Sequence, residues 1–319
     1  MGGNNNQKMK IYAVAFICFA SVGCMSEQVE VARQGAGVAS RFCNRGSLYP
    51  VRERSKYGYI NCNGELVIAP KFDFGGDFSE GIAAVKIAES WGYVDLTGKI
   101  VIAPKYRQAW GFSEGAAFVA EQGSTSWGVI DKGGGYLIKP KYAFGLKFSE
   151  GLAVVDVHGD GRVYVDRYGK EHHMVKQGFS PGDNFYEGLA VVQKEGRFGY
   201  MDRNGEIVIP ARYGEEISRF SEGIAAVIEN GRFKYIDREG HDVISARYEY
   251  ANAFSEGVAV VAVSEKWGVV DKKGNFVITP RYKAMGSFRD GLAHVINFDG
   301  TEGYINKAGE YVWGPKYAD

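Results

Sequence analysis

The chain repeats one sequence pattern of about 35 residues eight times. A valine marks each copy, and successive valines lie 34 to 37 residues apart, at positions 51, 85, 119, 155, 192, 227, 261 and 295. A period of this length is typical of modular arrays, in which each unit buries its hydrophobic face against the next. The repeat therefore decides the architecture, and it places most recurring motifs in the scaffold rather than in an active site.

Each copy predicts three short strands separated by turns. In the clearest copy the strand candidates are 82–87, 91–95 and 99–103. The chain's 20 Tyr, 19 Phe and 44 Gly are typical of aromatic strands joined by glycine turns. The sequence predicts an all-β fold over residues 42–319, a tandem array of eight three-stranded β-meander repeats that is open and twisted like a solenoid. A closed β-propeller is the alternative, although its blades usually have one strand more.

An acid or amide, followed three residues later by glycine, separates the second and third strands. Asp95 with Gly98 and Asp271 with Gly274 are examples. A side-chain acceptor suits the first place of a type I turn, and glycine accepts the positive φ of a G1 bulge. A calcium loop is the alternative, but one carboxylate per loop is far fewer than the about six to eight oxygens that calcium takes.

An aromatic residue beside glycine opens the second strand. Three copies have tryptophan there, in the pairs Trp91-Gly92, Trp127-Gly128 and Trp267-Gly268. We expect the ring to stack between neighbouring units and the glycine to let another backbone approach closely. A row of sugar-binding platforms is the alternative for the rings.

Two series of opposite charge recur along the repeats. Acids lie in segments of the F-S-E-G type, at Glu80, Glu114, Glu150, Glu187, Glu222, Glu256 and Asp290. Bases follow the third strand, at Lys71, Lys105, Lys141, Arg212, Arg247, Arg281 and Lys316. We expect each acid to pair with a base of the same or the preceding unit. Exposed pairs contribute only about 0.2–1 kcal/mol each, so their role is to fix the stacking register.

The N-terminal residues differ in kind from the repeats. Lys8 and Lys10 precede an apolar run over 11–20, and small residues and then Cys24 follow. This order predicts a signal peptide over 1–23, with Met9 as an alternative start. The segment resembles a bacterial lipoprotein signal, which implies a lipid on Cys24. Cleavage by an ordinary signal peptidase is the alternative.

Residues 24–41 are rich in small and polar residues, so we expect a flexible tether there. Export implies an oxidising compartment, in which Cys43 and Cys62 of the first repeat are a candidate disulfide. Two free thiols are the alternative.

Several segments in fixed order resemble the WG (or KWG) repeats of bacterial proteins: F-S-E-G, W-G-Y-x-D-x-x-G and I-x-P-x-Y. The resemblance covers all eight units and is weakest in the fourth, where Arg162-Val163 replaces Trp-Gly and the proline after the third strand is lost. It implies a β-rich repeat domain, often exported, with no established reaction.

The sequence carries no signature of catalysis. It lacks G-x-S-x-G, H-E-x-x-H and a phosphate-binding glycine loop. Its 38 acidic and 38 basic residues give no bias toward nucleic acid. We therefore expect no cofactor, no metal and no nucleic-acid partner.

The fourth unit and its flank carry the candidate binding patch. The longest spacing, the lost Trp-Gly and the lost proline coincide there, and irregular units are where binding features are tolerated. A decayed repeat explains the same facts. The patch comprises His158, His172, His173, Phe179 and Tyr186.

These features together predict a non-catalytic binding scaffold of the bacterial cell envelope. We expect it to be lipid-anchored at the outer membrane or cell surface, or else secreted or periplasmic, and to hold an unknown protein or a cell-wall glycan through Tyr and Trp anchors. One alternative is a carbohydrate-active enzyme of the glycoside hydrolase type, which requires a carboxylate pair about 5–9.5 Å apart. A structural spacer is another.

Overall fold

The computed structural model describes residues 46–214 and 217–315. The predicted signal peptide, the lipidation site Cys24, the tether and Cys43 lie outside the described residues, as does Lys316. Every regular element within the described ranges is a strand. In this part of the chain we find no helix with the length and apolar character needed to cross a membrane.

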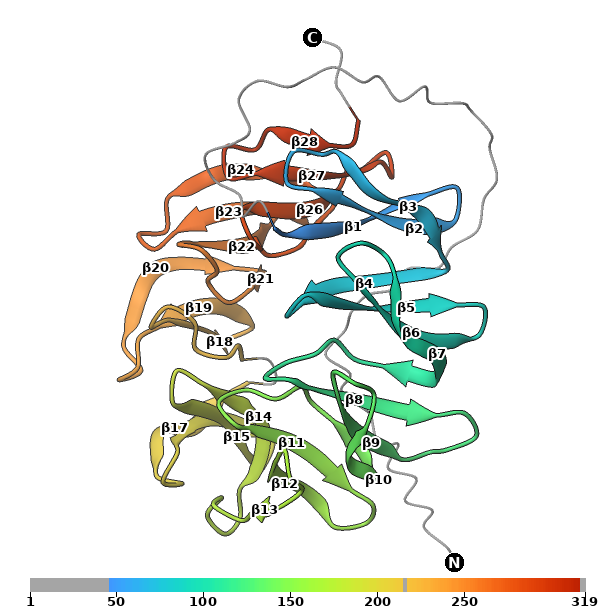
Figure 1. Cartoon of the computed structure of the whole chain (residues 1–319). Coiled ribbons are helices and arrows are strands. Elements are labelled where there is room, and N and C mark those ends of the chain that lie inside the picture. The colour runs from blue at the N-terminus through green and yellow to red at the C-terminus, as the bar shows by residue number, and fades with distance from the viewer. Residues whose placement is uncertain (1–45, 215–216, 316–319) are drawn as a thin grey trace, which may run out of the picture. The chain divides into compact units, whose positions relative to one another are not determined.

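The strands follow the repeat, and within each sheet every strand pairs antiparallel with its neighbour in the chain (Figure 1). We number the units 1 to 8 by their repeated valines. Units 1 to 4 contain β1 (Leu48–Glu53), β2 (Lys56–Asn61), β3 (Leu66–Phe72), β4 (Phe74–Ser79), β5 (Ile82–Ile87), β6 (Ser90–Asp95), β7 (Ile100–Ala109), β8 (Ala116–Glu121), β9 (Trp127–Asp131), β10 (Tyr136–Gly145), β11 (Leu152–Val157), β12 (Gly161–Asp166) and β13 (Glu171–His172). Units 5 to 8 contain β14 (Ser180–Tyr186), β15 (Leu189–Lys194), β16 (Arg197–Asp202), β17 (Ile207–Tyr213), β18 (Ala225–Glu229), β19 (Arg232–Ile236), β20 (Asp242–Tyr248), β21 (Tyr250–Ala251), β22 (Val258–Val263), β23 (Lys266–Asp271), β24 (Phe276–Tyr282), β25 (Ala284–Met285), β26 (Leu292–Ile296), β27 (Glu302–Asn306) and β28 (Tyr311–Trp313).

The expected all-β array of open sheets is confirmed, since no sheet of the described residues closes into a barrel. The structure adds a further strand at the start of several units: β4, β14, β21 and β25 each precede the three expected strands. The ten-residue strands β7 and β10 run from the third strand of one unit into the first strand of the next, so units 2 to 4 share one ten-stranded sheet.

The hydrophobic core lies between successive units. The repeated alanine and valine of the strand that directly follows the F-S-E-G segment, such as Ala83 and Val85 in β5, are fully buried. They pack with Tyr59, Ile68 and Phe72 of the preceding unit. Because each unit has a neighbour on both faces, this strand is buried on both sides, which explains its nearly continuous apolar sequence.

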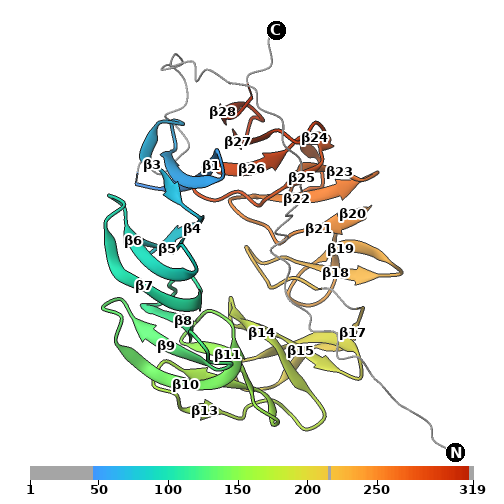
Figure 2. The same ribbon diagram turned by 90° about the vertical axis from the view of Figure 1, so that its right-hand side faces the viewer.

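Units 1 and 8 also contact each other, although no strand pairing joins them within residues 46–214 and 217–315. Their side chains form a hydrophobic cluster of Tyr49, Val51, Ile60 and Cys62 with Leu292 and Tyr304. The Tyr304 hydroxyl donates to the Pro50 carbonyl oxygen at 2.9 Å. In Figures 1 and 2 the first, blue unit accordingly lies beside the last, red one.

In most units a buried tyrosine lies in the strand that carries the repeated aromatic residue, as Tyr93 does in β6. Its hydroxyl fixes the backbone at the start of the next unit. The hydroxyls of Tyr59, Tyr93 and Tyr235 donate to main-chain carbonyl oxygens 17 residues further along the chain, at 2.8 Å. Burial raises the pKa of these phenols well above its usual value. They therefore remain protonated donors, and they hold the residues before each F-S-E-G segment in place.

Candidate functional site

The acids of the F-S-E-G segments, which we call the FSEG acids, join successive units. Glu222 has a φ of 57° and Gly223 a φ of 81°, as in the two-residue turns that join strands of a hairpin. The Glu222 carboxylate accepts from the Gly257 N–H at 3.0 Å and pairs with Lys272 at 3.0 Å. The same arrangement recurs in Glu80 with Gly115 and Lys132, Glu150 with Gly188 and Arg203, Glu187 with Gly223 and Arg238, and Glu256 with Gly291 and Lys307.

The pairing that the sequence predicted for these acids is wrong. Each FSEG acid of this set contacts the base that directly follows the turn acid of the next unit, and not a base after a third strand. Pairing of Ile82 with Asp95 places the F-S-E-G turn and the turn acid at one end of a unit. Pairing of Trp91 with Tyr106 places the exit of the third strand at the other end.

The turn acids are engaged with their own backbone. Asp271 Oδ1 accepts from the N–H groups of Lys273 and Asn275, both at 2.9 Å. Asp95 makes the same bonds to Thr97 and Lys99. Gly98 and Gly274 have φ values of 79° and 83°. A hairpin turn therefore accounts for these acids.

The second-strand tryptophans belong to clusters of aromatic rings between units. Trp91 lies 5.3 Å from Phe74, centroid to centroid, and Trp267 lies 5.8 Å from Tyr250. Trp127 stacks on Trp110 at 5.7 Å with an angle of 10° between the ring planes. Phe74 also lies 5.0 Å from Tyr57, and Tyr250 lies 6.0 Å from Phe233, both of the preceding unit. A ring from the segment before F-S-E-G therefore joins the two units, which the sequence did not predict.

Two of these mediating rings are half-open to solvent. Trp110 is 39% exposed, whereas Trp127 beneath it is 5% exposed. Tyr250 is 54% exposed and is backed by Trp267 and by Phe233, at 6.0 Å. Each exposed ring therefore rests on a more buried one, which holds its plane fixed.

Glycine beside the aromatic residue brings two backbones together. A Cβ on Gly92 would lie 2.6 Å from the Ile102 carbonyl oxygen, and one on Gly268 would lie 2.6 Å from the Ile278 carbonyl oxygen. A Cβ on Gly128 would likewise lie 2.8 Å from the Ile138 carbonyl oxygen.

Unit 6 has Lys234 where these units have glycine, a substitution visible in the sequence that our reasoning missed. Its ammonium pairs with Glu229 at 2.6 Å and with Asp242 at 2.9 Å, and Arg247 contacts Asp242 at 2.6 Å. Burial opposes the charge of Lys234, but the bonds to the two carboxylates outweigh it and raise its pKa. The lysine therefore remains protonated between the two carboxylates, as a fixed charge.

The structure does not gather the predicted patch into one cluster. Each of its residues has a different partner: His158 with Ser126 at 3.0 Å, His172 with Asp166 at 3.4 Å, His173 with Glu171 at 3.7 Å, Phe179 with Lys194 at 5.2 Å and Tyr186 with Arg219 at 4.5 Å. Cys62 is buried and disulfide-bonded. Its pairing with Cys43 remains a prediction, because Cys43 is not among the described residues.

Besides their FSEG acids, five units carry charged side chains within two residues of the repeated phenylalanine. We call them the inner charge cluster, which comprises Asp77, Lys147, Asp183, Arg219 and Arg289. Arg289 pairs with Asp77 at 3.1 Å and donates to the Phe78 carbonyl oxygen. In Figure 1, β4 (cyan) and β21 (orange) lie on the sides of their sheets that face each other.

The pKa values of two members of the inner charge cluster respond to charged residues far away in sequence, such as Lys147 to Arg219. Desolvation lowers the pKa of Lys147, and the positive charge of Arg219 lowers it further, against the opposite effect of Asp183 and Asp77. Burial raises the pKa of Asp183 despite its nearby cations. For Asp77, Lys147 and Arg219 the sequence signal is the variation of the residue directly before the repeated phenylalanine.

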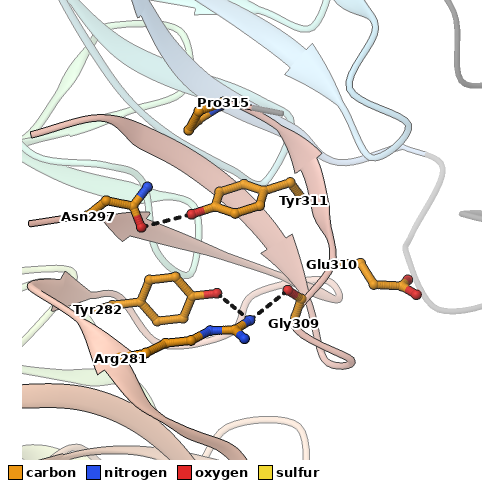
Figure 3. Close-up of a pocket in the computed structure, with 7 residues that line it drawn as sticks. All are labelled: Arg281, Tyr282, Asn297, Gly309, Glu310, Tyr311 and Pro315. Atoms are coloured by element: carbon orange, nitrogen blue, oxygen red, sulfur yellow. Dashed lines mark hydrogen bonds between the residues drawn. The ribbon is translucent and has the colours of Figure 1, made fainter. Parts of the chain in front are cut away.

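A groove of about 540 Å³ lies between units 7 and 8 (Figure 3). Arg281 donates to the Tyr282 hydroxyl at 2.9 Å and to the Gly309 carbonyl oxygen at 3.0 Å. The Tyr311 hydroxyl donates to the Asn297 side-chain oxygen at 2.9 Å. An equivalent groove of about 400 Å³ lies between units 1 and 2, so this feature belongs to the repeat. Within 46–214 and 217–315, no group of three or more His, Cys, Asp or Glu side chains is arranged to hold a metal ion.

The fold and these contacts define a tandem β-repeat protein whose units are joined by aromatic and charged side chains. A family model described as "WG containing repeat" matches residues 57–89, 91–123, 127–159, 198–233, 235–267 and 267–296. The chain belongs to this family. The matched segments leave out residues 160–197, which include the irregular part of unit 4.

Solved structures of similar fold include the computationally designed Ika8 protein, at a TM-score of 0.52 and 14% identity over 83% of this chain and 97% of that one. BamB from Moraxella catarrhalis has a TM-score of 0.50 and 10% identity over 88% and 98%. A eukaryotic initiation factor has a TM-score of 0.51 and 12% identity over 85% and 84%. At these identities the likeness concerns the fold alone. No curated protein matches the chain.

Proposed function

We propose that the protein is a non-catalytic binding scaffold of the bacterial cell envelope that holds a cell-wall glycan on its aromatic rings. The observation that carries the proposal is the pair of half-open rings, Trp110 and Tyr250, each resting on a more buried ring. The envelope location is supported by the sequence of residues 8–24 alone, and lipid on Cys24 would anchor the chain there.

The chemistry of the two rings suits a sugar. A flat aromatic face offers apolar area at little entropic cost when its plane is already fixed. The C–H face of a pyranose ring is flat and apolar in the same way. Trp110 and Tyr250 lie in units 3 and 7, so one chain offers two separate places for one long polymer, and two weak contacts on the same polymer reinforce each other.

The glycoside hydrolase alternative receives no specific support from the described residues. Glu229 and Asp242 are two carboxylates that share one partner, and Lys234 lies between them. That ammonium occupies the place that a glycosidic bond would need. A protein partner remains the other outcome that the experiment can reveal.

The test is cosedimentation of the purified full chain with insoluble cell-wall polysaccharide. We expect Trp110→Ala and Tyr250→Ala each to weaken retention several-fold, and the double variant to abolish it. Phe298→Ala is the matched control, because Phe298 is 57% exposed but no ring contact supports it in the described part of the chain.

Two results would refute the proposal: no retention of the wild-type chain, or equal retention of the double variant. Retention by an envelope protein with the polysaccharide removed, and sensitive to the same two substitutions, would replace the glycan with a protein partner.

A further inference from the structure

We propose that the groove between units 7 and 8 binds an acidic sugar residue, with the carboxylate on Arg281 and a hydroxyl on Asn297. This inference rests on the proposed function and deepens it, because it names a carboxylate-bearing glycan as the class of polymer. The groove has a volume of about 540 Å³ (Figure 3). This volume lies within the range of about 300–1,000 Å³ that is typical of small-molecule pockets.

The lining of this groove differs from that of its counterpart between units 1 and 2, although both occupy the same place in the repeat. Lys71, Phe72, Ile87, Lys99 and Ile100 line the first groove, and Arg281, Tyr282, Asn297, Glu310 and Tyr311 stand at the same repeat positions in the second. Phenylalanine and two isoleucines are thus replaced by tyrosine, asparagine and tyrosine, which form hydrogen bonds. The shape of the groove belongs to the repeat, whereas this polar lining suits a ligand with hydroxyl groups.

Asn297 is buried and yet keeps part of its hydrogen-bonding capacity. It is 7% exposed, and a buried amide is costly unless its polar atoms have partners. One N–H donates to Thr301 Oγ1 at 2.9 Å, and Oδ1 accepts from the Tyr311 hydroxyl at 2.9 Å. An amide has two N–H groups and two lone pairs on its oxygen. One donor and one acceptor site therefore remain without a partner among residues 46–214 and 217–315, and a single sugar hydroxyl can use both.

Arg281 supplies a positive charge that is held in place and still has free donors. Its guanidinium lies over the Tyr282 ring, 5.1 Å from the centroid, and Nη2 donates to the Tyr282 hydroxyl and the Gly309 carbonyl oxygen. Within the described ranges Nη1 and Nε have no hydrogen-bond partner, and the side chain makes no ion pair. Glu310 accepts instead from Asn306 at 2.7 Å, and Figure 3 shows its side chain directed away from the guanidinium. Arginine binds carboxylates through charge-assisted hydrogen bonds.

The groove and the exposed ring of Tyr250 lie at the same end of unit 7. Tyr250 rests on Trp267, and Trp267 is the direct cross-strand partner of Tyr282. Trp267 and Tyr311 both pack against the core cluster that contains Tyr282. One polymer can therefore stack a sugar on the ring and place an acidic sugar in the groove, and the two contacts reinforce each other.

The experiment is an NMR titration of the full chain, carrying ¹⁵N-labelled glycine, with glucuronate, glucose and acetate in separate arms. The signal of Gly309 reports on the groove, because Arg281 contacts its carbonyl oxygen. Gly98 is the internal reference, since it lies at the same position of the groove between units 1 and 2. We expect the Gly309 signal to shift and saturate with glucuronate, at a Kd about tenfold lower than for glucose or acetate, and the Gly98 signal not to saturate.

Three variants complete the test. Arg281→Met should raise the Kd of glucuronate to that of glucose and leave glucose unchanged. Asn297→Ile, which introduces the residue type of the first groove, should abolish saturable binding of both sugars. Lys71→Met is the matched control, because Lys71 contacts the Gly98 carbonyl oxygen at 3.1 Å, and it should change no Kd. Far-UV circular dichroism of each variant checks that it folds.

Three results would overturn the proposal: no saturable shift of Gly309 with glucuronate, an acetate or glucose Kd equal to that of glucuronate, or an unchanged glucuronate Kd in Arg281→Met. The titration and the cosedimentation test of the rings can fail independently. Cosedimentation measures retention of a polymer by Trp110 and Tyr250, whereas the titration measures one sugar residue in the groove.

Discussion

Replacing Lys234 by methionine tests whether the charge network of unit 6 stabilises the fold. The substitution keeps the length of the side chain and removes its charge. Lys234 is 7% exposed, and its two partners Glu229 and Asp242 are 45% and 40% exposed. The lysine is therefore buried, while the carboxylates still reach water.

The magnitude follows from this mixed exposure. Removing one partner of a fully buried ion pair costs about 3–5 kcal/mol, and an exposed pair contributes about 0.2–1 kcal/mol. Because Glu229 and Asp242 can regain water, we place the loss between these limits, at about 2 kcal/mol. For a protein of this size, a loss of about 2 kcal/mol corresponds to a fall in Tm of about 5 °C.

The assay is thermal unfolding followed by circular dichroism, with urea unfolding as a second measure. The matched variant is Lys234→Met with Asp242→Asn, which removes the repulsion that the lost ammonium leaves between the two carboxylates. We expect it to recover part of the stability. A Tm of Lys234→Met equal to that of the wild type would refute a stabilising role for the network.

The difference in stability between the wild type and Lys234→Met should decrease as the pH falls. Burial works against ionisation of Asp242, but the bonds from Lys234 and Arg247 outweigh it and lower the pKa of this carboxyl. A depressed folded-state pKa contributes stability above the unfolded-state pKa of about 4 and loses it as the pH falls through the folded value. The gap between wild type and Lys234→Met should therefore be full at pH 7 and shrink below pH 4.

Three further substitutions test contacts that recur in the repeats, each by urea unfolding. Gly92→Ala places a Cβ 2.6 Å from the Ile102 carbonyl oxygen and should cost about 1–3 kcal/mol; an unchanged midpoint would show that the two backbones can separate freely. Glu222→Gln keeps an acceptor for the Gly257 N–H and should cost about 0.5 kcal/mol, whereas Glu222→Ala should cost about 1–2 kcal/mol, and equal losses would contradict the hydrogen bond. Tyr235→Phe leaves a main-chain carbonyl without its donor and should cost about 1 kcal/mol, with faster amide exchange in unit 7 as the specific readout.

The parts of the fold that depend on neighbouring residues could be predicted from the sequence. Asp271 and Gly274 make their turn through bonds within five residues, so their spacing carries the information. The strands between such turns follow from the same spacing. Two of the additional first strands, β21 and β25, were missed because they have only two residues, too few to show an alternating pattern. The longer β4 and β14 contain Gly75-Gly76 and Pro181-Gly182, residues that are rare inside strands.

The contacts between units could not be predicted in the same way. The partner of Glu222 depends on how far one unit turns against the next, and the repeat presents several bases at similar distances along the chain. The ion pair of Arg289 with Asp77, at 3.1 Å, joins units 8 and 2, which are not neighbours in sequence. Only the arrangement of the whole array brings these residues together, and the sequence of a single repeat does not determine that arrangement.

The contact of unit 1 with unit 8 bears on how this protein can evolve. A solenoid with free ends gains or loses a repeat at either end at little cost, because every unit touches only its neighbours. Here a ninth copy at the C-terminal end would have to stand between Tyr304 and Pro50, whose hydrogen bond joins the two ends. An added copy at that end would therefore have to break this contact, which a solenoid with free ends does not require.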